Sequence, residues 1–286
     1  MGGLSGSDIF TLSLYTILGT PNADVLNGSV VDDAIYGLAG NDQLFGFGGD
    51  DLLDGGTGFD QLFGGQGNDT LLAGNDADGS DLRGEDGDDT LTGSNGADLL
   101  IGGGGDDTLV GGSGNDTLSG EGGNDVLQGG EGNDNLYDSD APGQAASNSI
   151  DAGAGDDTIR VYQTNAGSVT TVSGGNGRDT YLLQALGSTG QLIASDFAVG
   201  ANGDVLNINE LLTSSSGYSG GNPFDPALGY LRLVQQGADT LLQWDQYGPV
   251  AGGSGWRSVI TLQNTVAITL TVDNFSPATP PDGSSV

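Results

Sequence analysis

Apolar residues recur every nine positions along the first half of the chain. Between Gly19 and Tyr137 the recurring unit is Gly-Gly-x-Gly-x-Asp-x-U-x, where U is a large apolar residue, and residues 64–72 are a clean copy. Six copies follow one another from Gly19, and six more follow one another from Gly84. A fixed period of this kind is typical of a repeat architecture in which each unit is one small structural element.

The two halves of the unit predict different elements. Glycines tolerate positive φ, so the first half predicts a tight turn. The Asp-x-U-x half predicts a strand that is too short to be stable alone and whose apolar residue points inward. Because such units bury their apolar residues only by stacking, the chain is expected to form an all-β solenoid. The predicted inward column is Leu26, Ile35, Leu44, Leu53, Leu62, Leu71, Leu91, Leu100, Leu109, Leu118, Leu127 and Leu136.

Other segments interrupt or flank the repeats. The irregular unit 73–83 is either a bulge or a break between two rolls, and we favour a bulge because the alternation of the copies then continues. An insertion covers residues 138–151, and two further copies occupy residues 152–160 and 174–182. Residues 1–18 contain an alternating, β-prone stretch that predicts a strand capping the open end of the roll.

Residues 19–182 thus form the predicted roll, and residues 183–286 form a separate region without the period. Short β-prone stretches separated by Gly, Ser and Pro predict a small β-rich C-terminal region. The expected strands cover residues 191–197, 204–208, 230–234, 240–244, 258–262 and 267–272.

An aspartate column is as regular as the leucine column. Stacked units place these carboxylates in rows a few ångströms apart, which is repulsive unless a cation lies between them. Carboxylate and backbone carbonyl oxygens suit Ca²⁺, which accepts six to eight oxygen ligands. The candidate ligands are Asp42, Asp51, Asp60, Asp69, Asp89, Asp98, Asp107, Asp116, Asp125, Asp134 and Asp157, with Asp24, Asp33 and Asp179 as the weaker candidates.

The repeats resemble the RTX family of secreted calcium-binding proteins. The resemblance implies a right-handed parallel β-roll in which two nonapeptides make one turn. It also implies about ten calcium ions between successive turns, each bridging aspartates two copies apart, such as Asp42 with Asp60. The alternative for a Gly- and Asp-rich segment is a disordered spacer, which is the state we expect without calcium.

A second resemblance lies after the repeats. Asp196-Phe197, Gly200, the run 203–206 and Leu211-Leu212 are similar to the C-terminal target domain of type I secreted proteins. The resemblance implies an uncleaved signal that is read by an ABC exporter. The alternative is that Asp196 and Asp204 are ordinary aspartates at a strand end and in a turn.

The amino-acid composition argues against several kinds of binding partner and against enzymatic activity. Five Arg and Lys residues against 39 Asp and Glu residues give a net charge of −34, so nucleic acid and anionic membrane surfaces are not expected partners. No run approaches eighteen apolar residues, so no membrane insertion is expected. His and Cys are absent, and Ser219 in a Gly-x-Ser-x-Gly motif therefore lacks the base of a serine hydrolase. We expect no enzymatic activity.

The leading interpretation is a calcium-binding, monomeric roll that serves as the C-terminal structural and secretion module of a type I secreted adhesin or toxin. Its expected location is secreted or at the bacterial cell surface. The alternatives are a ligand-binding adhesion module for glycans or surfaces, and the non-catalytic tail of a secreted hydrolase.

The residues after the inward apolar positions predict an outward face that is unusually apolar. Phe45, Phe63, Ile101 and Tyr137 lie on that face. We expect the segment from Gln191 onward to fold back over it and bury Phe63 and Ile101. The alternative is an exposed patch that contacts another domain or molecule.

Overall fold

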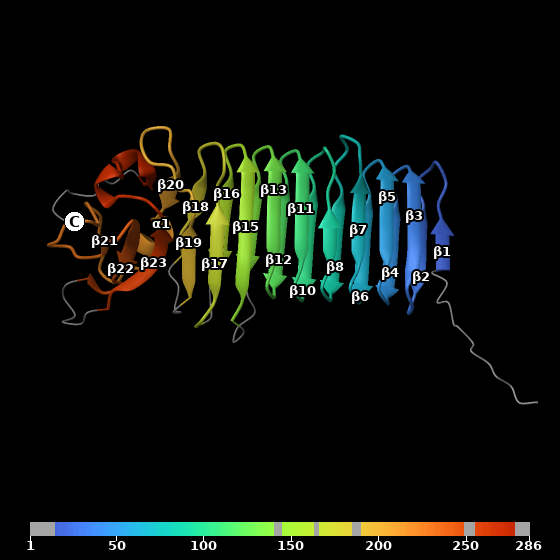
Figure 1. Ribbon diagram of the computed structural model, residues 1–286, viewed down its shortest axis with the longest axis horizontal. Helices are drawn as coiled ribbons and strands as arrows, with labels where there is room; N and C mark the ends of the chain where they lie inside the picture. The colour runs from blue at the N-terminus through green and yellow to red at the C-terminus, as the bar shows by residue number, and fades with distance from the viewer. Residues whose placement is uncertain (1–14, 140–144, 163–165, 185–189, 249–254, 278–286) are drawn as a thin grey trace, which may run out of the picture.

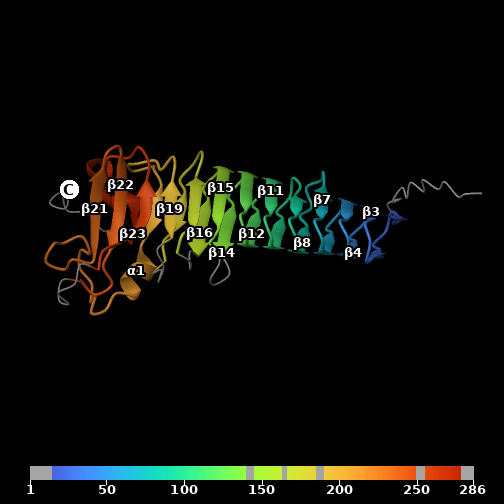
Figure 2. The ribbon, with the colours of Figure 1, turned by 60° about the horizontal axis from the view of Figure 1, so that its bottom comes forward.

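The computed structural model describes residues 15–139, 145–162, 166–184, 190–248 and 255–277. They form an elongated β-solenoid, with strands stacked side by side along its long axis (Figures 1 and 2). Successive strands alternate between two sheets, so two nonapeptides complete one turn. The only α-helix in these residues is the short α1 (Asn209–Thr213), and no helix there is long and apolar enough to cross a membrane.

The first sheet has 13 strands and begins at the N-terminal end of the roll. In spatial order it contains β1 (Tyr15–Leu18), β3 (Asp33–Ala39), β5 (Leu52–Thr57), β7 (Thr70–Gly74), β9 (Thr90–Thr92), β11 (Thr108–Ser113), β13 (Val126–Glu131), β15 (Ser147–Ala154), β17 (Val169–Ser173), β19 (Gln191–Ala194), β23 (Arg257–Leu262), β22 (Asp239–Trp244) and β21 (Leu231–Gln236).

The second sheet has 11 strands and covers the opposite side of the core. In spatial order it contains β2 (Val25–Ser29), β4 (Gln43–Gly48), β6 (Gln61–Gln66), β8 (Asp81–Asp86), β10 (Leu99–Gly104), β12 (Thr117–Gly122), β14 (Asn135–Ser139), β16 (Thr158–Tyr162), β18 (Thr180–Leu182), β20 (Val205–Asn207) and β24 (Phe275–Ser276).

Parallel pairing places equivalent repeat positions next to one another. Leu100 of β10 pairs with Leu118 of β12, and Leu109 of β11 pairs with Leu127 of β13. From Ile35 to Leu136 every predicted inward residue has 0% of its surface exposed, which confirms the apolar column. Leu26 is only partly buried, because it lies in the first strand of the second sheet and one of its sides has no neighbouring turn.

The strands extend further into the repeat than the pattern predicted. β11 runs from position seven of one copy through the first three positions of the next, so the glycines at positions one and two lie within strands. The turn itself is confined to positions four to six. The glycine at position four, such as Gly114 with φ of +133°, has the left-handed conformation that the turn requires.

The irregular unit is a bulge, as predicted, and the roll continues through it. Residues of β6 pair with residues of β8 that lie 20 positions later in the chain, such as Leu62 with Leu82. After the bulge, β8 pairs with β10 at the usual spacing, and Leu82 fills the apolar column with 0% exposure. Two extra residues are therefore accommodated in the turn without a change of sheet.

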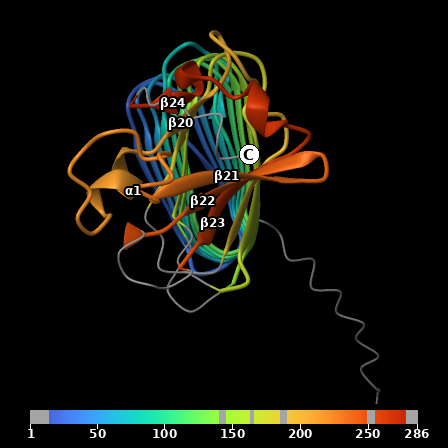
Figure 3. The same ribbon diagram turned by 90° about the vertical axis from the view of Figure 1, so that its left-hand side faces the viewer.

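The C-terminal region packs against the end of the roll, so the prediction that it folds back over Phe63 and Ile101 was wrong. β23 continues the first sheet by parallel pairing with β19, and β22 and β21 then add to it in antiparallel order. Figure 3 shows these three strands across the end of the roll. Without neighbours the outer edges of β19 and β20 would carry unpaired backbone groups, and these pair with β23 and β24, respectively.

The Phe63 ring remains on the outward face of the roll. It stacks on the ring of Phe45 from the neighbouring turn, with centroids 4.9 Å apart. Both rings line a shallow depression together with Phe47. Their shared contact along the sheet therefore takes the place of the predicted cover.

The prediction of a strand at residues 267–272 was also wrong. The structure has two short 3₁₀ turns there, Ala267–Thr269 and Val272–Asn274. The Thr269 amide and hydroxyl both donate to the Val266 carbonyl oxygen, at 2.9 Å and 2.6 Å. These local hydrogen bonds compete with strand pairing, although the β-prone composition of the segment favours a strand.

Candidate metal centres

Each candidate aspartate lies at the end of a turn, directly before a strand or, for Asp33, as the first residue of one. The glycine-rich turn brings the backbone of neighbouring turns close together, and the aspartate side chain points into the space that this leaves. Asp24 is half-buried, and each of the other thirteen predicted aspartates is at most 3% exposed. Buried carboxylates are rare unless they are paired, hydrogen-bonded or bound to a metal.

Hydrogen bonds join these side chains into two rows. In each row the backbone N–H of one aspartate donates to Oδ1 of the equivalent residue one turn later, as from Asp89 to Asp107 at 2.8 Å. The first row contains Asp24, Asp42, Asp60, Ser80, Asp98, Asp116, Asp134, Asp157, Asp179 and Asp204. The second row contains Asp33, Asp51, Asp69, Asp89, Asp107, Asp125 and Asn148.

The second carboxylate oxygen is different, because in most turns it is buried and has no hydrogen-bond donor. Within the described residues, Oδ2 lacks a partner in Asp42, Asp51, Asp60, Asp69, Asp89, Asp107, Asp116, Asp134, Asp157 and Asp179. A buried acceptor without a partner costs about 1–3 kcal/mol, and more when it is charged. Ten such atoms in two regular rows therefore indicate that a cation or a proton completes them.

The first glycine of the repeat provides the space for this oxygen. A Cβ atom at Gly37 would lie 2.5 Å from both Asp42 Oδ2 and the Gly55 carbonyl oxygen of the next turn. The absence of that Cβ lets a carboxylate and a carbonyl oxygen converge on the same small volume. Among the described residues no three acidic, His or Cys side chains converge on one point, so backbone carbonyls would have to complete a calcium shell.

Burial raises the pKa of these carboxyl groups when no cation is bound. The pKa of Asp107 is raised to about 8, first by burial and then by the neighbouring charges of Asp125 and Asp89. Burial likewise raises the pKa of Asp116 and of Asp179 to about 7. A divalent cation would reverse this effect by favouring the ionised form, so the residues present fit calcium.

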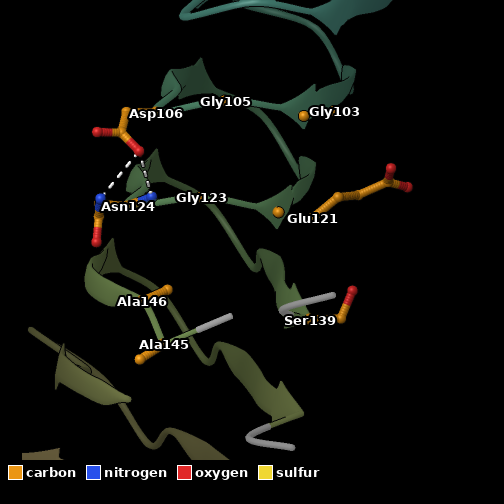
Figure 4. Close-up of a pocket in the computed structure, with 11 residues that line it drawn as sticks. Gly103, Gly105, Asp106, Glu121, Gly123, Asn124, Ser139, Ala145 and Ala146 are labelled. Atoms are coloured by element: carbon orange, nitrogen blue, oxygen red, sulfur yellow. Dashed lines mark hydrogen bonds between the residues drawn. The ribbon is translucent and has the colours of Figure 1, made fainter. Parts of the chain in front are cut away.

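The neighbouring position five forms a separate row on the surface. Asp106 is exposed, and its Oδ1 accepts hydrogen bonds from the backbone N–H and the side-chain amide of Asn124, at 2.8 Å and 2.9 Å (Figure 4). The Asp106 N–H in turn donates to Asp88 Oδ1 at 2.8 Å. In this surface row the N–H of the later residue donates to the side chain of the earlier one, which is the reverse of the order in the buried rows. The sequence pattern did not reveal this row.

The contrast between adjacent aspartates gives a first testable expectation. Asp107→Ala removes the buried oxygens of a candidate ligand and should weaken the two expected calcium sites between its own turn and the adjacent turns. Asp106→Ala removes only hydrogen bonds on the exposed surface and should leave the number of bound calcium ions unchanged. Isothermal titration calorimetry measures both numbers, and equal losses in the two variants would contradict this assignment.

Three members of the rows were not among the predicted ligands. Ser80 replaces an aspartate in the bulged unit, and Asn148 replaces one within the predicted insertion at residues 138–151. Asp204 extends the first row: its Oδ1 accepts from the Asp179 N–H at 3.0 Å and its Oδ2 from the Ala198 N–H at 2.7 Å. The spacing of Asp204 from the buried Leu206 matches the Asp-x-U spacing of the repeat and could have identified it.

No curated protein matches the chain. The solved structures with similarity include "Solution Structure of AlgE6R3 subunit from the Azotobacter vinelandii Mannuronan C5-epimerase", which is 24% identical over 63% of this chain and 79% of that chain, with a TM-score of 0.26.

A protein-family model matches most of the repeats that form the roll. Residues 18–46, 45–79, 81–109, 110–137 and 143–161 match the family described as "RTX calcium-binding nonapeptide repeat (4 copies)". These ranges cover the members of both aspartate rows up to Asp157, apart from Ser80. This part of the chain therefore belongs to the RTX calcium-binding nonapeptide repeat family.

Proposed function

We propose that this protein is a calcium-dependent β-roll that folds on export and serves as the C-terminal structural and secretion module of a type I secreted bacterial adhesin or toxin. The observation that carries the proposal is the double row of buried aspartates, ten of which have a second oxygen without a hydrogen-bond partner within the described residues. About ten calcium ions complete these rows. The protein acts as a monomer, in the medium or at the cell surface.

Calcium-dependent folding would make export directional, because the chain would fold only after it leaves the cell. A metal that binds only the folded chain stabilises that state, and a site that does not exist in the unfolded chain contributes its binding energy to folding. With a net charge of −34, the chain strongly repels itself when calcium is scarce. It therefore stays unfolded in the low calcium of the cytosol and folds outside, where calcium is abundant.

The region after the last repeat supports a role in both capping and export. The side chain of Asp196 accepts hydrogen bonds from the Ser173 hydroxyl at 2.7 Å and the Gly174 N–H at 3.0 Å. These bonds fix the start of the C-terminal region to the last turns of the roll. The proposed partner of this region is the ABC exporter of a type I system.

We also propose that the chain is not an enzyme. It contains no His, Cys or Lys, so the usual side chains for proton transfer and nucleophilic catalysis are missing. The buried carboxylates take part in backbone hydrogen-bond rows and face narrow spaces between turns. A substrate bond would not reach them there.

A secretion assay tests the export role. In bacteria with a type I exporter, the full chain should appear in the medium, whereas a chain truncated after Leu182 should remain inside the cell because it lacks the exporter signal. The same strain with an inactive exporter is the control, and it should retain both chains. Equal secretion of the truncated and full chains would contradict the proposal.

A further inference from the structure

The second position of the repeat divides the turns into two kinds. In most copies this residue has a positive φ, including copies where it is not glycine, such as Leu38 at +81°, Phe47 at +72° and Glu85 at +81°. In these copies, apart from the one that contains Asp125, the aspartate four residues later has a buried Oδ2 without a donor among the described residues, as in Asp42 and Asp51. The positive φ is thus a property of the turn and not only of glycine.

Three copies carry Thr20, Ser29 or Ser94 at the second position, and in these copies φ is not positive. In each of them the residue donates two hydrogen bonds to Oδ2 of the aspartate four residues later. Ser94 donates to Asp98 Oδ2 from its N–H at 2.6 Å and from its hydroxyl at 3.0 Å.

The same arrangement recurs at the N-terminal end of the roll. Ser29 donates to Asp33 Oδ2 at 2.6 Å and 2.9 Å, and Thr20 donates to Asp24 Oδ2 at 2.6 Å and 2.8 Å. The near-identical distances in three separate turns show that one local geometry is repeated. Its requirement is a short hydroxyl side chain at a position that is otherwise glycine or a residue with positive φ.

Asp98 is the informative case, because it lies inside the roll and both of its oxygens are occupied. Its Oδ1 accepts from the Ser80 N–H at 2.6 Å, and its Oδ2 accepts from Ser94. A Cβ at Gly93 would lie 2.7 Å from Asp98 Oδ2, compared with 2.5 Å between a Cβ at Gly111 and Asp116 Oδ2. The carboxylate has therefore moved away from the glycine and toward the serine.

We propose that a Ser or Thr at the second repeat position makes a metal-free turn, in which two internal donors replace the calcium ion. Asp24, Asp33 and Asp98 would then be structural hydrogen-bond acceptors and not calcium ligands. This inference rests on calcium binding by the other turns of the roll and is independent of export.

The position of the interior metal-free turn is consistent with the bulge. Ser80, which precedes Asp98 in the first row, has no carboxylate to contribute to a bridging site. The Ser94 hydroxyl also lies 3.2 Å from the Asp78 carbonyl oxygen and thus contacts the bulged unit. The calcium series of the first row is therefore divided into two parts, one before Ser80 and one after Asp98.

Isosteric substitutions in the full-length chain separate the two kinds of turn. Calcium equivalents measured by equilibrium dialysis should be unchanged in Asp98→Asn and lower by one or two in Asp116→Asn, its neighbour in the same row. Circular dichroism in saturating calcium confirms that each variant is folded. Equal losses of calcium in the two variants would overturn the proposal.

A gain of binding provides the second arm of the test, in case either asparagine variant does not fold. Ser94→Gly removes both the hydroxyl and the restriction on φ, and should add one calcium equivalent that Ser94→Gly/Asp98→Asn lacks. Ser113→Gly, at the third repeat position of a neighbouring turn, is the matched control and should add none. No gain in Ser94→Gly would overturn the proposal, and a wild-type chain that binds no calcium at all would instead overturn the calcium function itself.

Discussion

Removal of calcium is expected to unfold the stacked turns from Gly37 to Tyr137. A site held at ten times its dissociation constant stabilises the folded state by about 1.4 kcal/mol, so about ten sites together contribute on the order of 14 kcal/mol. This equals the full stability of a typical domain, about 5–15 kcal/mol. Without bound calcium, the unpartnered carboxylate oxygens and the net charge of −34 favour the unfolded chain.

Far-ultraviolet circular dichroism measures this directly. The chain in excess chelator should show a disordered spectrum, and added calcium should restore the β spectrum at about 10⁻⁴–10⁻³ M, the range of extracellular calcium modules. Magnesium is the control, because it requires near-ideal octahedral geometry and keeps its waters, so it should not restore the spectrum. A full β spectrum in chelator would show that the rows do not need the metal.

Acidification should partly replace calcium. In the metal-free fold the pKa of Asp107 is about 8 and that of Asp69 about 6, whereas an aspartate in the unfolded chain titrates near 4. Between about pH 4 and about pH 8 the folded state therefore binds more protons than the unfolded state. Its stability is fully present below about pH 4 and is lost as the pH rises to about 8.

In calcium-free buffer the chain should thus gain β structure as the pH falls from about 8 to about 5. With saturating calcium the dependence should be opposite, because protons compete with the metal for the same oxygens and weaken its binding. Circular dichroism at both pH values, with and without calcium, gives the four spectra that are needed. A metal-free chain that is equally disordered at both pH values would exclude this linkage.

The repeat pattern predicted those features that depend only on position within the copy. Leu109 is buried because it is the eighth residue, and Asp107 is buried because it is the sixth, so a correct register was sufficient for both. Parallel stacking of identical units leaves no other way to cover a single apolar residue per strand. Because every unit stacks in the same way, the alternation of the copies also predicted that the roll continues through the bulge, where β8 pairs with β6 and β10.

Features that depend on one particular turn or on the end of the roll were not predictable in this way. The sequence shows Ser94 at the second repeat position, where seven of the fourteen copies have glycine, but not that its N–H and hydroxyl turn toward Asp98. The position of the C-terminal strands depends on the open edges of β19 and β20, which exist only once the roll has formed.

The alternation of two sheets has a consequence for how such a chain can change in length. A gain or loss of eighteen residues adds or removes one whole turn, and every later strand keeps its sheet and every later aspartate its row. A gain of nine residues would instead move all later strands to the opposite sheet, exchange the two rows and present the C-terminal cap to the wrong edges. Lineages of such genes should therefore lengthen in steps of fifty-four nucleotides, and steps of twenty-seven should survive only in compensating pairs.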